Sequence, residues 1–128
     1  MSEYFRPDVK IVGSREAVDK ESNIYEAATF QVLPHEVPKN IMDEIAKIAG
    51  DGKARVTVST DFGIKEFGTG TSAMCSVSLT CNQDETSIDK AIGIAGDLAR
   101  GYALEQRAAA EASFVALMSQ RSAGPNYK

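Results

Sequence analysis

Residues 55–81, which read RVTVSTDFGIKEFGTGTSAMCSVSLTC, decide the fold of this chain. Both halves of the stretch alternate between apolar and polar residues with a period of two, which is typical of β-strands. Pairing Ile64 with Ala73 keeps the apolar residues of both halves on one face of an antiparallel pair. That register closes on a two-residue loop, Gly68-Thr69, with glycine in the first position of a type II′ turn; a four-residue loop keeps the same register. The sequence therefore predicts a long hairpin with strands at 54–67 and 70–81.

The glycines at 63, 68 and 70 raise the alternative of a phosphate-binding loop. The run GTGTS lacks the spacing and the lysine of a Walker motif, and no helical pattern follows it. We therefore interpret these glycines as turn residues.

Two segments have a helical pattern. In VPKNIMDEIAKIAGDGK, proline suits the first turn and three isoleucines fall on one face, which predicts a short helix at 38–49. A much longer helix is expected at 86–118. Thr86 and Asp89 resemble a capping box at its start, and Asp84 or Ser87 are alternative caps.

One further strand is expected at 24–33, where IYEAATFQVL is rich in β-forming residues. Residues 1–21 are mixed in charge, and only VKIV at 9–12 has the composition of a short strand. The order of elements predicts an α+β domain whose small antiparallel sheet is covered on one face by helices. Three regions follow: an arm or edge strand at 1–21, an α+β core at 22–104, and a helix extension with a polar tail at 105–128.

Composition excludes several classes of protein. Hydrophobic residues make up 43% of the 128 and charged residues 25%, as in ordinary globular domains, and the net charge is −4. An acidic balance weakens any function that needs a strong phosphate-neutralising surface. The chain has no apolar run of about 18 residues and no apolar core in its first ten residues, so we expect neither a membrane span nor a secretory signal. These features favour a cytoplasmic location.

The two cysteines and the single histidine offer little chemistry. Cys75 and Cys81 lie on one expected strand about 20 Å apart, which is too far for a disulfide, so buried thiols are predicted. With one histidine, His35, and no CxxC motif, we expect no metal and no cofactor. His35 has no nucleophile anchored near it in sequence, and Cys75 falls on the apolar face. The sequence therefore predicts a protein that is not an enzyme.

Two elements look too long for a monomer. Strands of this length would reach about 40 Å, so the hairpin tip with Phe62, Ile64, Phe67 and Met74 is expected to project or to contact another chain. The second half of the long helix would expose apolar residues beyond the sheet. A homo-oligomer is therefore predicted, with an interface at Leu104, Phe114, Val115 and Met118; the alternative is that the helix breaks near Gly101 and its tail folds back over its own sheet.

The polar face of the hairpin is the candidate site. Its hydroxyl-rich ligand platform consists of Thr57, Ser59, Ser76, Ser78 and Thr80, although such residues are also common on a solvated sheet face. Near them, Arg55, Lys65 and Phe67 could neutralise phosphates and stack a base, which predicts binding of single-stranded nucleic acid. The alternative is an inhibitor or sequestering protein that binds a host protein or a small polar ligand.

The stretch RVTVSTDFGIKEFGTGTSAMCSVSLTC, with the polar turn and helix that follow, resembles a pattern in small uncharacterised bacteriophage accessory proteins. The resemblance covers residues 55 to about 105 and brings no catalytic residues with it. It implies a short accessory protein acting in the cytoplasm of a bacterial host, on DNA or on a component of host defence.

Overall fold

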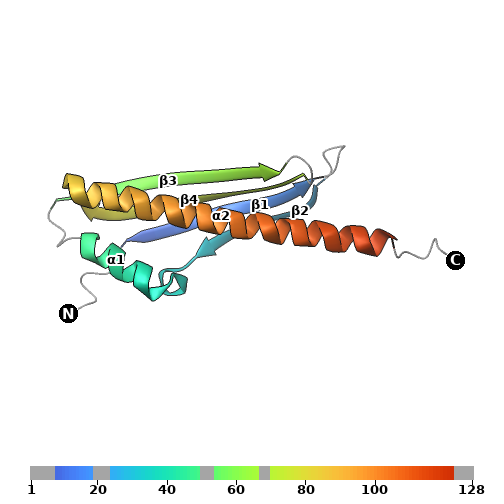
Figure 1. Ribbon diagram of the computed structural model, residues 1–128, viewed down its shortest axis with the longest axis horizontal. Helices are drawn as coiled ribbons and strands as arrows, with labels where there is room; N and C mark the ends of the chain where they lie inside the picture. Colours follow the sequence, from blue (N-terminus) through green and yellow to red (C-terminus); the bar gives the residue numbers. More distant parts are fainter. Residues whose placement is uncertain (1–7, 19–23, 50–53, 67–69, 123–128) are drawn as a thin grey trace.

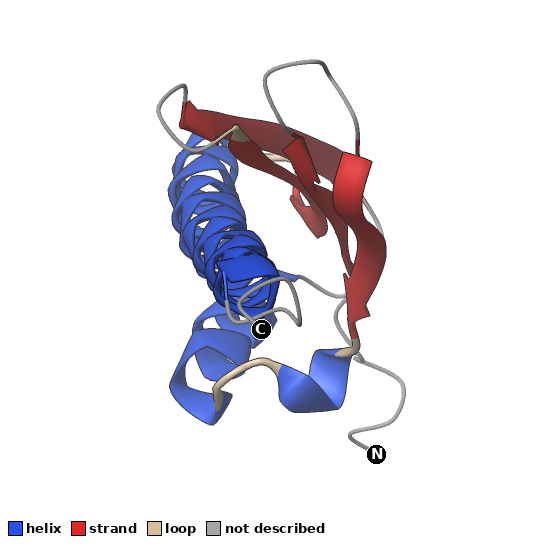
Figure 2. Ribbon diagram, turned by 90° about the vertical axis from the view of Figure 1, so that its right-hand side faces the viewer, coloured by secondary structure: helices blue, strands red, loops and turns tan. Residues whose placement is uncertain are grey.

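The computed structural model describes residues 8–18, 24–49, 54–66 and 70–122. Four antiparallel strands form one sheet in the order β2-β1-β4-β3, and helices cover one of its faces (Figures 1 and 2). The predicted α+β fold is therefore confirmed. Its elements are β1 (Val9–Val18), β2 (Ile24–Val32), the 3₁₀ helix η2 (Pro34–Glu36), α1 (Lys39–Ala49), β3 (Arg55–Glu66), β4 (Thr71–Asn82) and α2 (Glu85–Ser122).

The hairpin of β3 and β4 has the predicted register. Continuous pairing runs from Arg55 opposite Asn82 to Glu66 opposite Thr71, with Ile64 opposite Ala73. The predicted turn residues 68–69 lie outside the described residues. Gly70 has φ +73°, and a Cβ there would collide with the carbonyl of Val18, whose own N–H donates to the Gly70 oxygen at 3.0 Å. A glycine is thus required where the hairpin meets β1.

The N-terminal segment differs most from expectation. Residues 9–18 form β1, an inner strand that pairs with β2 on one side and β4 on the other, so an arm or edge strand is wrong for them. The alternating pattern is hard to read because Gly13 and Arg15 occupy helix-facing positions in β1. Phe30 from β2 covers Gly13, and Glu26 from β2 pairs with Arg15 at 3.0 Å. Side chains of the neighbouring strand therefore provide the packing and the ion pair that the β1 sequence cannot provide by itself.

The hairpin also does not project from the domain as expected. β1 lies beside β4 over nearly its whole length, and all four strands run side by side beneath α2 (Figure 1). Phe62 and Ile64 are half-buried and pack against the core, whereas Met74 points to the opposite face of the sheet and is exposed. The apolar tip is therefore split between two faces.

The core lies between the sheet and the two helices. Alternate residues of β4 are fully buried, among them Cys75, Val77 and Leu79, and they pack against small residues of α2 such as Ala95 and Ala99. Alanines allow the helix backbone to approach the sheet closely. The helix begins where predicted, and Asp84 is its N-cap, because its carboxylate accepts hydrogen bonds from the N–H and the hydroxyl of Ser87 at 2.8 and 2.9 Å.

The second half of α2 remains attached to the sheet further than predicted. Arg15 donates to Glu26 and, at 2.8 Å, to Gln106, while the Ser113 hydroxyl donates to Glu26 at 3.1 Å. Ala110 is fully buried between these contacts. Only the last part of α2 extends beyond the strands (Figure 1), so the helix does not leave the domain near residue 105.

Candidate binding surface on the open face of the sheet

No described helix covers the second face of the sheet, which we call the open face (Figure 2). The strand registers place on it the side chains that alternate with the core residues, drawn from all four strands. Most of them are small or carry a hydroxyl group. They include Lys10, Val12, Ser14 and Glu16 of β1, Thr29 and Gln31 of β2, Ser72, Met74, Ser76, Ser78 and Thr80 of β4, and Arg55, Thr57, Ser59, Asp61, Gly63 and Lys65 of β3.

The predicted ligand platform is part of this open face. The hydroxyls of Ser59 and Ser78 are 3.0 Å apart across the two strands, and those of Thr57 and Thr80 are 3.4 Å apart. Each hydroxyl can donate one hydrogen bond and accept two, so these pairs keep capacity for a ligand while holding their side chains in fixed positions. The platform is therefore an ordered row of acceptors and donors.

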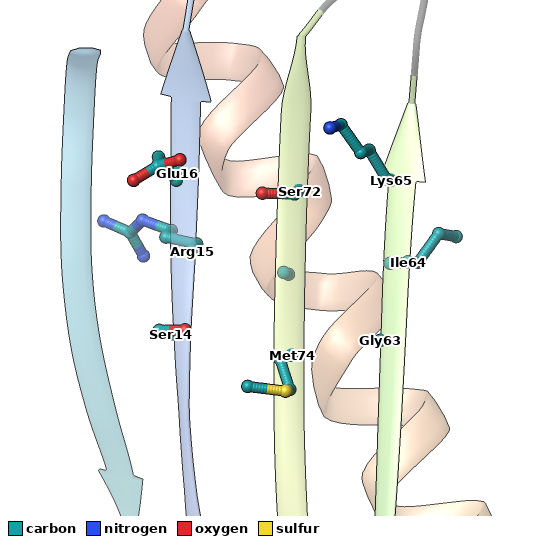
Figure 3. Close-up of a pocket in the computed structure, with 9 residues that line it drawn as sticks. Ser14, Arg15, Glu16, Gly63, Ile64, Lys65, Ser72 and Met74 are labelled. Atoms are coloured by element: carbon teal, nitrogen blue, oxygen red, sulfur yellow. The ribbon is translucent and has the colours of Figure 1, made fainter.

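Met74 stands near the middle of the open face with 50% of its surface exposed. Its cross-strand neighbours are Ser14 on β1 and Gly63 on β3, both too small to cover it (Figure 3). A hollow of about 400 Å³ beside Met74 is lined by residues of β1, β4 and β3, and another of about 620 Å³ lies between Met74 and Gln31 on β2. A flexible apolar side chain therefore separates two hollows whose walls combine apolar surface with hydroxyl, amide and charged groups.

The residues predicted to bind nucleic acid are not brought together. Arg55 and Lys65 lie at opposite ends of β3, about 33 Å apart along the strand, and Asp61 lies between them on the same face. Phe67 lies outside the described residues. Lys10 adds a base on β1, and Glu16 adds an acid, so the open face carries interspersed charges of both signs.

The thiols are buried, as predicted. Burial, with a smaller contribution from the Asp61 carboxylate, raises the pKa of the Cys75 thiol to about 11. Burial likewise raises the pKa of Cys81. Both side chains are therefore protonated at neutral pH and face the core. His35 is exposed in η2, the turn between β2 and α1.

The described residues contain no group of three or more His, Cys, Asp or Glu side chains placed to hold a metal ion. Within the same residues, no helix combines the length and the apolar character needed to cross a membrane.

The predicted oligomer interface is only partly visible. Leu104 and Val115 of α2 are exposed to 37% and 56%, whereas the side chains of Phe114 and Met118 lie outside the described part of the structure. Ile92, an exposed apolar residue of α2, was not among the predicted residues. The expected homo-oligomer remains a prediction.

Sequence reasoning missed the contribution of β1 to the open face. Lys10, Val12, Ser14 and Glu16 alternate with core residues, but the charged and glycine positions of this segment hid the alternation. Met74 was predicted as a residue of the hairpin tip and not as a central residue, because its central position depends on β1 being its neighbour. Comparison of the chain with family models, with curated proteins and with solved structures gives no match.

Proposed function

We propose that this protein is a non-enzymatic binding protein that inhibits or sequesters another protein by docking it on the open face. The position of Met74 carries the proposal. A half-exposed methionine between two hollows can adapt to a partner's side chains, because its chain is flexible and its sulfur is polarizable. The small neighbours Ser14 and Gly63 leave room for inserted groups.

The charge pattern favours a protein partner over nucleic acid. A polyanion is bound by a surface of one sign, and the bases Lys10, Arg55 and Lys65 are interspersed with the acids Glu16 and Asp61. Mixed charges, hydroxyl groups and one central apolar anchor are what a polypeptide segment can complement. The resemblance to bacteriophage accessory proteins implies a host protein of the bacterial cytoplasm as the partner class.

A comparison of two surface variants tests this proposal. Met74→Asp places a charge at the centre of the open face, and Ile92→Asp does the same at a residue of nearly equal exposure, 49% against 50%, on α2. In pull-downs from bacterial lysate, we expect wild type and Ile92→Asp to retain a partner protein that Met74→Asp does not retain. Retention of this partner should persist after nuclease treatment. Loss of an anchor residue typically weakens binding about tenfold or more.

The same experiment separates the alternatives. A partner that disappears after nuclease treatment, together with salt-dependent binding of labelled single-stranded oligonucleotides, would replace this proposal with the nucleic-acid function. Equal retention by both variants would place the binding surface elsewhere. If no protein is retained, the proposal of a protein partner is contradicted, and binding of a small polar ligand is the remaining hypothesis.

A further inference from the structure

The outer edge of β3 offers a second surface, independent of the proposed function. β3 ends the sheet, and no described strand lies beyond it (Figure 1). Its twelve residues pair with β4 without a register shift and contain no proline. Long regular edges are sites at which another strand can add, and natural sheets normally block them with bulges, prolines or charges. The other edge strand, β2, is shorter, and its pairing with β1 is interrupted by a register shift.

The backbone groups that point outward from β3 can be identified. The carbonyl of Ala54 accepts a hydrogen bond from the N–H of Gln83 at 2.8 Å, so this pair is of the hydrogen-bonded type. Hydrogen-bonded and non-hydrogen-bonded pairs alternate along an antiparallel ladder. Gly63, opposite Met74, therefore falls in a non-hydrogen-bonded pair. The N–H and C=O of Gly63, and those of Asp61 and Lys65, point away from β4 toward the outer edge.

The sequence around Gly63 is self-complementary. Asp61-Phe62-Gly63-Ile64-Lys65 reads as acid, apolar, glycine, apolar and base. When two copies of such a strand pair antiparallel about Gly63, each Asp61 faces the Lys65 of the other copy. On the opposite face, each Phe62 faces the Ile64 of the other copy. Opposite charges and apolar pairs placed directly across two strands both stabilise the pairing.

We infer that two copies of this chain associate through β3, edge to edge and antiparallel, with Gly63 on the twofold axis. The two Gly63 residues then exchange both backbone hydrogen bonds, and Asp61 and Lys65 exchange theirs with each other. The four-stranded sheets join into one sheet of eight strands. Phe62 and Ile64, half-buried in the single chain, gain apolar neighbours at the seam. The open faces of the two copies become continuous.

Lys65 already interacts with another group of its own chain. Its ammonium group has three donors, so an added carboxylate partner from the second copy does not require that interaction to break. The matched register of Asp61 and Lys65 supports the pair whether or not either side chain has another partner.

A cysteine cross-link tests the register of the two strands. Hydrogen-bonded cross-strand residues have Cα atoms about 5.5 Å apart, within the range that a disulfide spans. Gly63→Cys is accommodated, because an added Cβ meets only the Ala73 oxygen, at 3.9 Å. Under copper-phenanthroline oxidation we expect this variant to form a covalent dimer. Wild type serves as the control because its two thiols are buried.

A second cysteine variant distinguishes the inferred register from a different register of the same two strands. In the inferred register, the two Ser59 residues are about 27 Å apart, so Ser59→Cys should not cross-link. A register centred on Ser59 would instead place the two Ser59 residues directly opposite each other, within the range that a disulfide spans. Cross-linking of Ser59→Cys without cross-linking of Gly63→Cys would therefore overturn the inference.

Charge reversal tests the same pairing without a covalent bond. In sedimentation experiments over a wide concentration range, Asp61→Lys or Lys65→Asp alone should weaken dimerisation about tenfold, because two attractive pairs become repulsive. The double variant Asp61→Lys with Lys65→Asp should restore it. Circular dichroism of each variant checks that the single chain stays folded. A wild-type chain that is monomeric at every concentration, or a double variant that does not recover, would contradict the inferred interface.

Discussion

The two faces of β4 differ in their contribution to the fold. On one face Cys75, Val77 and Leu79 are fully buried under α2, and on the other Met74, Ser76 and Ser78 reach the surface. The helix-facing residues determine whether the chain folds, because their contacts cannot be replaced by water. The open-face residues are held in place by the same backbone but contribute little to the core. Side chains on the open face can therefore be substituted without loss of the fold.

The largest expected effect comes from truncating one residue on each face of β4. Leu79→Ala removes a fully buried side chain in the centre of the core and should lower the free energy of unfolding by about 3–4 kcal/mol. Met74→Ala removes a side chain of similar size from the open face, half of it already in water, and should cost less than about 1 kcal/mol. Urea unfolding of the two variants measures the difference.

Similar losses of unfolding free energy for the two truncations would contradict the difference described between the two faces of β4. A cost of several kcal/mol for Met74→Ala would show that the open face is covered in the folded protein, since an exposed methionine has few contacts to lose. The Leu79 variant needs a check by circular dichroism at low temperature, so that loss of stability is distinguished from a changed fold.

A smaller effect is expected from adding a methyl group to one glycine on each face. A Cβ on Gly13 would collide with the ring of Phe30 and the carbonyl of Met74, so Gly13→Ala should destabilise the fold by about 1–3 kcal/mol. Gly63 has open space on the other face, and Gly63→Ala should be neutral or slightly stabilising. Thermal unfolding monitored by circular dichroism compares the two, and an equal loss at both positions would contradict the packing described for β1 and β2.

The same contrast explains how much could be predicted from the sequence. The register of β3 and β4 was predictable, because Ile64, Ala73 and their neighbours alternate without interruption and only one pairing buries them all. The long helix was predictable from its alanine-rich second half and its polar start. Both elements carry their own pattern and need no partner to be recognised.

The place of β1 could not be predicted in this way. Arg15 is acceptable on a helix-facing position only because Glu26 of β2 and Gln106 of α2 accept its hydrogen bonds, and Ser113 of α2 donates in turn to Glu26. These residues are distant in sequence, and the local pattern of residues does not predict that they are in contact. Without β1 in the sheet, the open face could be seen only as one polar side of a hairpin, and Met74 could not be recognised as central.

The smallest effect in the series concerns this polar group on the otherwise apolar face. The hydrogen bond from Arg15 lowers the pKa of the Glu26 carboxyl below its ordinary value of 4.5; the Ser113 hydroxyl acts in the same direction, and burial opposes both. A carboxyl whose folded pKa is depressed contributes stability above its unfolded pKa and loses that contribution as the pH falls through the folded value. The network should thus stabilise the fold at neutral pH and fail in acid.

Glu26→Gln isolates this contribution. At pH 7 the variant should be about 1–2 kcal/mol less stable than wild type, because a charge-assisted pair that is about three-quarters buried is replaced by a neutral one. As the pH falls below the ordinary carboxyl value and through the lowered folded pKa of Glu26, the two proteins should converge, since the wild-type carboxyl then takes up a proton. Denaturation curves at a series of pH values give the comparison, with Glu44→Gln as an exposed carboxylate control. A difference that persists unchanged in acid would mean that Glu26 acts through packing and not through its charge.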